Sequence, residues 1–251
     1  MHIVVDESWR EETGIYLKRL NDALTISDEW GGSFKKYWPG CFFSTHDPTN
    51  SAAIALRLGI YATNIFSTSL QASGEIENQW GKGIFVLVPL SARFLLESWG
   101  SVHFSRITLT RLIEHNDIER EENRVNRLTH GSRLDKESKV VLPFGGETDT
   151  QSFNVMNFID SLSDVGDQPK IFYNFLCEAC HPNFVQSSYF QLAGPTLPNW
   201  SNDSYKELGH QVLEKTVKAI EFASSGIQSD ILYILETATQ YIEDENEMKK
   251  A

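Results

Sequence analysis

Cysteine is scarce in this chain, with three in 251 residues. Three cysteines cannot build the disulfide framework that stabilises many small secreted domains. The first residues also lack the basic flank and the long apolar core of a signal peptide. We therefore expect a cytoplasmic protein that works in a reducing compartment.

Long apolar runs and an excess of basic residues are also missing. The most apolar stretch, Gly83–Phe104, is interrupted by Pro89, Arg93, Glu97 and His103. A membrane-spanning helix needs about 20 mostly apolar residues, so we expect no membrane partner. The net charge of −12 disfavours nonspecific binding to nucleic acid or to an anionic membrane. This net charge does not exclude a local basic groove.

Helical periodicity dominates what is present, and no clear set of partner strands accompanies it. We expect an all-α fold, with a single bundle of about six or seven helices over residues 49–251. We also expect an irregular N-terminal arm rich in aromatic residues, 1–48, to pack on this bundle, and the acidic residues Glu243–Glu247 to fray. The expected helices are Asp6–Leu24, Asp47–Ser73, Ile84–Leu112, Ser152–Ser163, Pro169–Cys180, Asn202–Ser224 and one from Ser229 onward.

Glycine, proline and charged residues set the expected breaks. Pro89 predicts a kink in the second long helix, and Gly100 predicts a loosened turn there. Gly226 predicts a helix stop, and Ser229 with Asp230 predicts a new helix cap. The charged stretch Glu114–Lys139 has nearly balanced signs, which favours a solvated surface. A buried strand at Ile84–Val88 is the alternative to a helix start.

The segment Cys177-Glu178-Ala179-Cys180-His181 contains the C-x-x-C-H pattern of c-type haem attachment. It also ends an apolar helix, on which Cys177 and Tyr173 share a stripe. Free cysteine is among the most buried residue types, and structural zinc needs four ligands. We interpret both cysteines as core residues and expect no haem, no metal and no other cofactor.

Arg93 and Glu97 stand four residues apart in an apolar helix, so they share a face and can pair. Two interpretations are open: a structural ion pair, or a polar pocket that an anionic group can enter. His181 ends its helix before Pro182, where it either caps the helix or supplies an acid or base. Arg93, Glu97 and His181 are the candidate site residues.

These residues carry a resemblance. Arg93-x-x-x-Glu97 on an early helix, then Tyr173-x-x-Leu176-Cys177-Glu178-x-x-His181-Pro182-Asn183 on a later one, resembles a bacterial helical family grouped with the HEPN-like domains. The layout extends from about Ala52 to Ala223. The family has no settled activity, so the resemblance implies an α-helical bundle more firmly than a reaction.

Better-known HEPN proteins are toxin and antiviral ribonucleases, in which an arginine precedes a histidine by a short fixed spacing at a dimer interface. His181 departs from that motif, since Asn174, Phe175 and Leu176 occupy the arginine positions. The resemblance implies RNA or a nucleotide as partner, a homodimer, and a role in stress or phage defence. Arg93 would hold phosphate, Glu97 would orient it, and His181 would move protons. The alternative is a non-catalytic helical interaction module, and whether the protein is an enzyme stays open.

Overall fold

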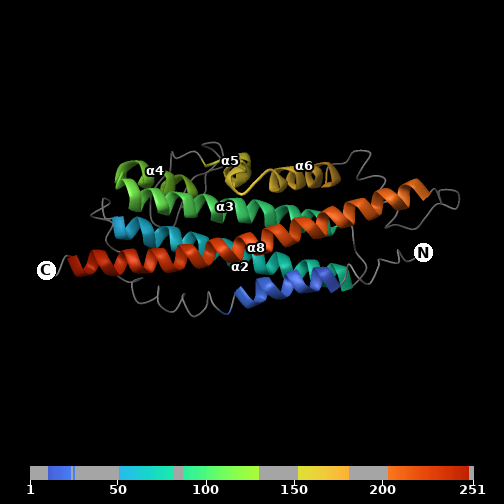
Figure 1. Ribbon diagram of the computed structural model, residues 1–251, viewed down its shortest axis with the longest axis horizontal. Coiled ribbons are helices and arrows are strands. Elements are labelled where there is room, and N and C mark those ends of the chain that lie inside the picture. The colour runs from blue at the N-terminus through green and yellow to red at the C-terminus, as the bar shows by residue number, and fades with distance from the viewer. Residues whose placement is uncertain are drawn as a thin grey trace, which may run out of the picture.

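Three long helices form the centre of the molecule and run side by side along its longest axis (Figure 1). The computed structural model describes residues 11–23, 25, 51–81, 87–129, 152–180 and 203–248. The long helices are α2 (Ser51–Gly81), α3 (Val88–His115) and α8 (Asp203–Met248). Their mutual contacts bury a hydrophobic core that includes Phe66, Leu95, Leu96, Ile227 and Ile231.

Shorter helices cover this centre. α4 (Ile118–Thr129), α5 (Val155–Ser161), the short 3-10 turn η2 (Leu162–Asp164) and α6 (Gln168–Cys180) lie on one side of α3 (Figure 1). A helix over residues 11–23 lies on the other side of the bundle and buries Leu17 and Leu20. The described residues contain helices and no strand, so the all-α prediction is confirmed.

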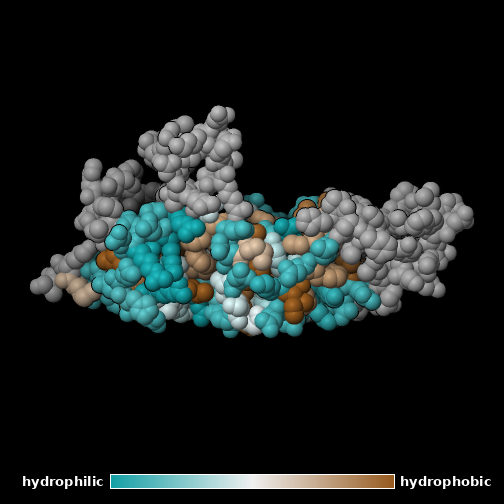
Figure 2. All heavy atoms as spheres, turned by 90° about the horizontal axis from the view of Figure 1, so that it is seen from above, coloured by the Kyte–Doolittle hydropathy of each residue, from teal (hydrophilic) through white to brown (hydrophobic). Residues whose placement is uncertain are grey.

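The predicted arm and the predicted domain boundary fall largely on residues outside the described ranges. Of residues 1–48, the structure describes the helix 11–23 and residue 25, and this helix lies within the predicted Asp6–Leu24. No described helix is both long enough and apolar enough to cross a membrane. Figure 2 looks down on the side that carries α4, α5 and α6, and the described surface there is mostly hydrophilic, with small separate hydrophobic patches.

The predicted kink at Pro89 is wrong, because Pro89 lies in the first turn of α3. The first N–H groups of a helix have no intrahelical acceptor, so a proline there loses nothing. Gly100 does not loosen the helix either. A Cβ at Gly100 would lie 2.6 Å from the carbonyl oxygen of Phe158, so this glycine lets α5 pack directly on the α3 backbone.

The predicted break in the last helix is also wrong. α8 runs without interruption through Gly226, Ser229 and Asp230. A Cβ at Gly226 would overlap the indole ring of Trp99, so the glycine is needed for the close approach of α3 and α8. The acidic residues Glu243–Glu247, expected to fray, are helical up to Met248. Likewise α2 continues beyond the predicted end at Ser73 to Gly81.

Part of the charged stretch packs against the bundle. Within α4, Glu121 and Val125 are buried against the body, although a solvated surface was expected. The buried Glu121 carboxylate accepts from Arg124 Nη1 at 3.0 Å, which compensates its removal from water. Residues 130–151 lie outside the described ranges.

Candidate functional site

Arg93 and Glu97 pair as their spacing predicts, and Tyr173 of α6 joins them. Arg93 Nε donates to Glu97 Oε1 at 2.9 Å. The Tyr173 hydroxyl donates to the same Glu97 oxygen at 3.2 Å and lies 3.4 Å from Arg93 Nη2. We call these three residues the Arg93 cluster. It joins the two helices that carry the resemblance, and its charged side chains are each 27% exposed.

The electrostatics of the Arg93 cluster keep it in one charge state. Burial lowers the pKa of Arg93, but the hydrogen bond to Glu97 and the neighbouring acidic groups raise it above its ordinary value. Burial and the Glu97 charge raise the pKa of Tyr173 to about 12. The cluster is therefore a permanent cation beside a carboxylate and a neutral phenol at neutral pH.

The third predicted site residue, His181, lies outside the described residues, so the convergence of the predicted trio stays a prediction. It follows directly after Cys180, the last residue of α6. Cys177 and Cys180 are free thiols, each half-buried. Burial raises the pKa of the Cys180 thiol to about 11, so this group is protonated at neutral pH and is a weak nucleophile.

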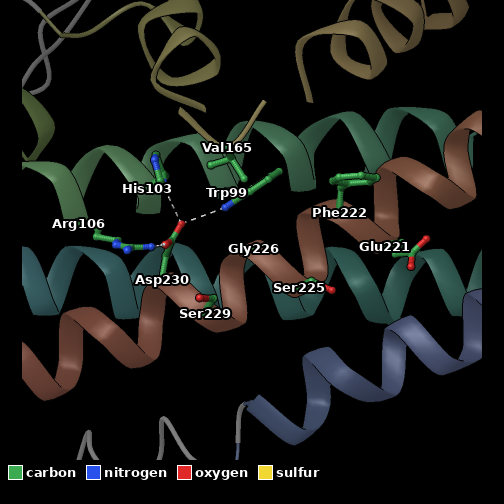
Figure 3. Close-up of a pocket in the computed structure, with 10 residues that line it drawn as sticks. All are labelled: Trp99, His103, Arg106, Val165, Glu221, Phe222, Ser225, Gly226, Ser229 and Asp230. Carbon is green, nitrogen blue, oxygen red and sulfur yellow. Dashed lines mark hydrogen bonds and ion pairs between the residues drawn. The ribbon is translucent and has the colours of Figure 1, made fainter. Parts of the chain in front are cut away.

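A second polar cluster connects α3, α8 and η2, and it was not predicted from the sequence. Asp230 of α8 lies at its centre, and its Oδ2 accepts from Trp99 Nε1 at 3.0 Å and from His103 Nδ1 at 2.8 Å (Figure 3). Its other oxygen accepts from Arg106 Nη1 at 2.7 Å. On the opposite edge of the imidazole, His103 Nε2 lies 2.9 Å from Asp164 Oδ1. We call these five residues the Asp230 network.

Charge pairing makes the burial of the Asp230 network tolerable. Burial alone would raise the pKa of Asp230, but hydrogen bonds from His103 and Arg106 outweigh it and leave the pKa below its usual range. Burial lowers the pKa of His103, and the carboxylates of Asp230 and Asp164 more than reverse this, so the pKa is raised. The raised pKa means that His103 keeps its imidazolium form between the two carboxylates to a higher pH than a free histidine does, with Arg106 as the second cation.

This arrangement favours a structural role for His103 over acid–base catalysis. Both ring nitrogens of His103 already have acceptors, so neither can take a proton from a substrate without breaking the network. The two carboxylates also lie on opposite ring edges. In the described ranges, no three His, Cys, Asp or Glu side chains are grouped so that they could hold a metal ion.

The sequence did contain a signal for the Asp230 network. Trp99, His103 and Arg106 follow one another at helical spacings of four and three, so they share one face of α3. Polar side chains on such an apolar helix need a buried acceptor. That acceptor, Asp230, is 131 residues from Trp99, and sequence reasoning assigned it to a helix cap instead.

Comparison with known proteins identifies no relative. No protein-family model, no curated protein and no solved structure matches the chain. The geometry of its own residues therefore carries the functional argument.

Proposed function

We propose that this protein is a HEPN-like helical protein with an RNA- or nucleotide-related role in stress or phage defence. In this proposal Arg93 contacts phosphate, Glu97 orients its guanidinium, and His181 moves protons. The observation that carries it is the meeting of Arg93 and Glu97 on α3 with Tyr173 on α6. These are the two helices whose motifs resemble the family.

The chemistry of Arg93 supports a phosphate contact. A guanidinium presents several N–H donors in a plane, and the contacts to Glu97 and Tyr173 use only part of them. Glu97 fixes the orientation of the plane, so a ligand pays little side-chain entropy to use the remaining donors. The side chain is 27% exposed, and so a ligand can reach it from solvent.

The test compares the full-length wild type with Arg93→Ala and His181→Ala. Labelled single-stranded RNA measures binding and cleavage, and a labelled nucleotide measures binding alone. Because a charge-assisted hydrogen bond contributes about 1.5–3 kcal/mol, Arg93→Ala should weaken binding roughly 10- to 100-fold. His181→Ala should abolish RNA cleavage or nucleotide binding and leave the helical fold intact.

Arg111→Ala is the matched control, because Arg111 is an exposed arginine near the other end of α3. It should bind and cleave like the wild type, and circular dichroism should show the same helix content in all variants. If Arg93→Ala binds RNA and nucleotide as tightly as the wild type, Arg93 has no role as a phosphate ligand. If the wild type neither binds nor cleaves, the RNA proposal fails.

The second candidate is a non-catalytic helical interaction module. Leu87, Leu90 and Phe94, at the start of α3, follow one another at helical spacing and are 41%, 50% and 38% exposed. An apolar stripe of this kind is typical of a protein contact surface. The net charge of −12 also works against a polyanion ligand. This candidate would be favoured if the wild type self-associates, Leu90→Asp does not, and neither binds RNA.

A further inference from the structure

A groove on the surface of α8 is lined in part by the Asp230 network, and no residue of the Arg93 cluster lines it. Its volume is about 330 Å³, near the lower end of pockets that hold small molecules. α8 forms one side of it, and α3 and the chain just after η2 form the other (Figure 3). We call it the α8 groove.

Aromatic and apolar groups form the middle of the α8 groove. Phe222 and Val165 are 37% and 51% exposed, so both present apolar surface to an incoming molecule. Trp99 reaches the groove across Gly226, where any side chain would overlap its indole ring. Trp99 itself is 3% exposed, so it closes the groove from below, and a planar ring can contact Phe222 and Val165. Aromatic contacts favour such a ligand.

Polar side chains line the groove along one face of α8. Glu221, Ser225 and Ser229 are spaced four residues apart, so they lie in a row facing the groove. This row spans about 12 Å at the helical rise of roughly 1.5 Å per residue. A ligand of two fused rings with a short side arm matches that length.

The charges around the α8 groove favour a cation over an anion. His103 and Arg106 are the basic residues of the groove, and the carboxylates of Asp164 and Asp230 already balance them. Glu221 adds one further carboxylate, which hydrogen-bonds with Tyr16 of the helix 11–23. A carboxylate has several acceptor positions, so Glu221 can accept from an ammonium group as well.

We propose that the α8 groove binds a small planar aromatic amine. Its ring lies between Phe222 and Val165, and its ammonium group pairs with Glu221. The hydroxyl groups of Ser225 and Ser229 lie along the edge of the ligand. This site is independent of the Arg93 cluster, so it stands or falls apart from the RNA proposal.

The experiment uses tryptamine as the probe and indole-3-acetate as its anionic counterpart, measured by calorimetric titration of the full-length protein. Tryptamine should bind with a Kd below about 1 mM, and indole-3-acetate at least about 10-fold more weakly. Glu221→Gln should remove most of this preference. Ser225→Leu, a change at an exposed position, should fill the groove and abolish binding of both compounds.

Ser67→Leu is the matched control, because Ser67 is an exposed serine of α2 outside the groove. It should bind tryptamine with the wild-type Kd. The proposal is overturned if tryptamine shows no saturable binding, if Ser225→Leu binds like the wild type, or if both compounds bind equally well. Arg93→Ala should leave tryptamine binding unchanged, which separates this result from the RNA experiment.

Discussion

Asp230 is a buried residue with three polar partners. Its carboxylate accepts from Trp99, His103 and Arg106, all on α3. The carboxylate side chain is 3% exposed, so solvent cannot replace a lost partner. Removing one member of a buried, hydrogen-bonded set leaves the others desolvated and unpaired.

Asp230→Ala should therefore destabilise the fold strongly. The substitution leaves the buried His103 and Trp99 donors without an acceptor, and breaking such a buried pair costs about 3–5 kcal/mol. Urea denaturation measures the free energy of unfolding. The control is Asp160→Ala on α5, since the Asp160–Lys170 ion pair is 53% exposed on both sides and such pairs contribute about 0–1 kcal/mol. Equal losses in the two variants would contradict a structural role for the network.

Contacts between residues close in the sequence could be predicted, and contacts between distant residues could not. Arg93 and Glu97 stand one helical turn apart, so their pairing follows from the helix alone. Tyr173 entered only through its motif, and its contact with both was not predicted. Asp230 follows Ser229 and resembles a capping residue, because local statistics cannot reveal a partner 131 residues away.

At the scale of elements, the helices themselves were predictable and their ends were not. Periodic apolar residues marked α2, α3, α6 and α8, since an amphipathic stripe is a local pattern. The predicted ends were wrong where a glycine or proline had another role than breaking a helix. Gly226 was taken as a stop, but its missing side chain makes room for Trp99. Pro89 was taken as a kink, but it begins α3.

A pair of glycine substitutions tests the packing of α3 on α8. Alanine is better than glycine inside a helix by about 0.5–1 kcal/mol, so Gly74→Ala should stabilise the protein, since its Cβ meets nothing within 4 Å. Gly226→Ala should do the opposite, because its Cβ would overlap the Trp99 indole and overpacking typically costs about 1–3 kcal/mol.

Thermal and urea denaturation of both variants give the comparison. The midpoint of unfolding should rise for Gly74→Ala and fall for Gly226→Ala, although both substitutions raise the helix propensity by the same amount. If Gly226→Ala raised the midpoint as well, the glycine would have no packing role, and the close approach of α3 and α8 would be wrong.

At the scale of the whole molecule, the sequence predicted one helical bundle but not which helices meet. Each amphipathic stripe shows which face is buried, and it does not identify the neighbour. The structure places α2, α3 and α8 together and lays α5, η2 and α6 over α3 (Figure 1). His103 binds across these layers, because its two ring nitrogens face Asp230 on α8 and Asp164 on η2.

This bridge should make stability depend on pH in a defined direction. The pKa of His103 is raised above 6.5 in the folded protein, because Asp230 and Asp164 outweigh the effect of burial. Its contribution is therefore complete below pH 6.5 and is lost as the pH rises through the folded-state value. The pKa of Asp230 is lowered from 3.8, so its contribution is present above that value and is lost in stronger acid. Both contributions are complete between these limits.

The measurement is the free energy of unfolding by urea at pH values from about 4 to 9, for the wild type and His103→Gln. The stability difference between them should be largest between about pH 4 and 6.5 and should shrink as the pH rises further, because only the wild type then loses an imidazolium. His115→Gln is the control, since His115 is 68% exposed at the end of α3, and its profile should follow the wild type. A difference that stays constant with pH would mean that the pKa of His103 is the same in the folded and unfolded protein. Asp164 and Asp230 would then not hold the layers together through its charge.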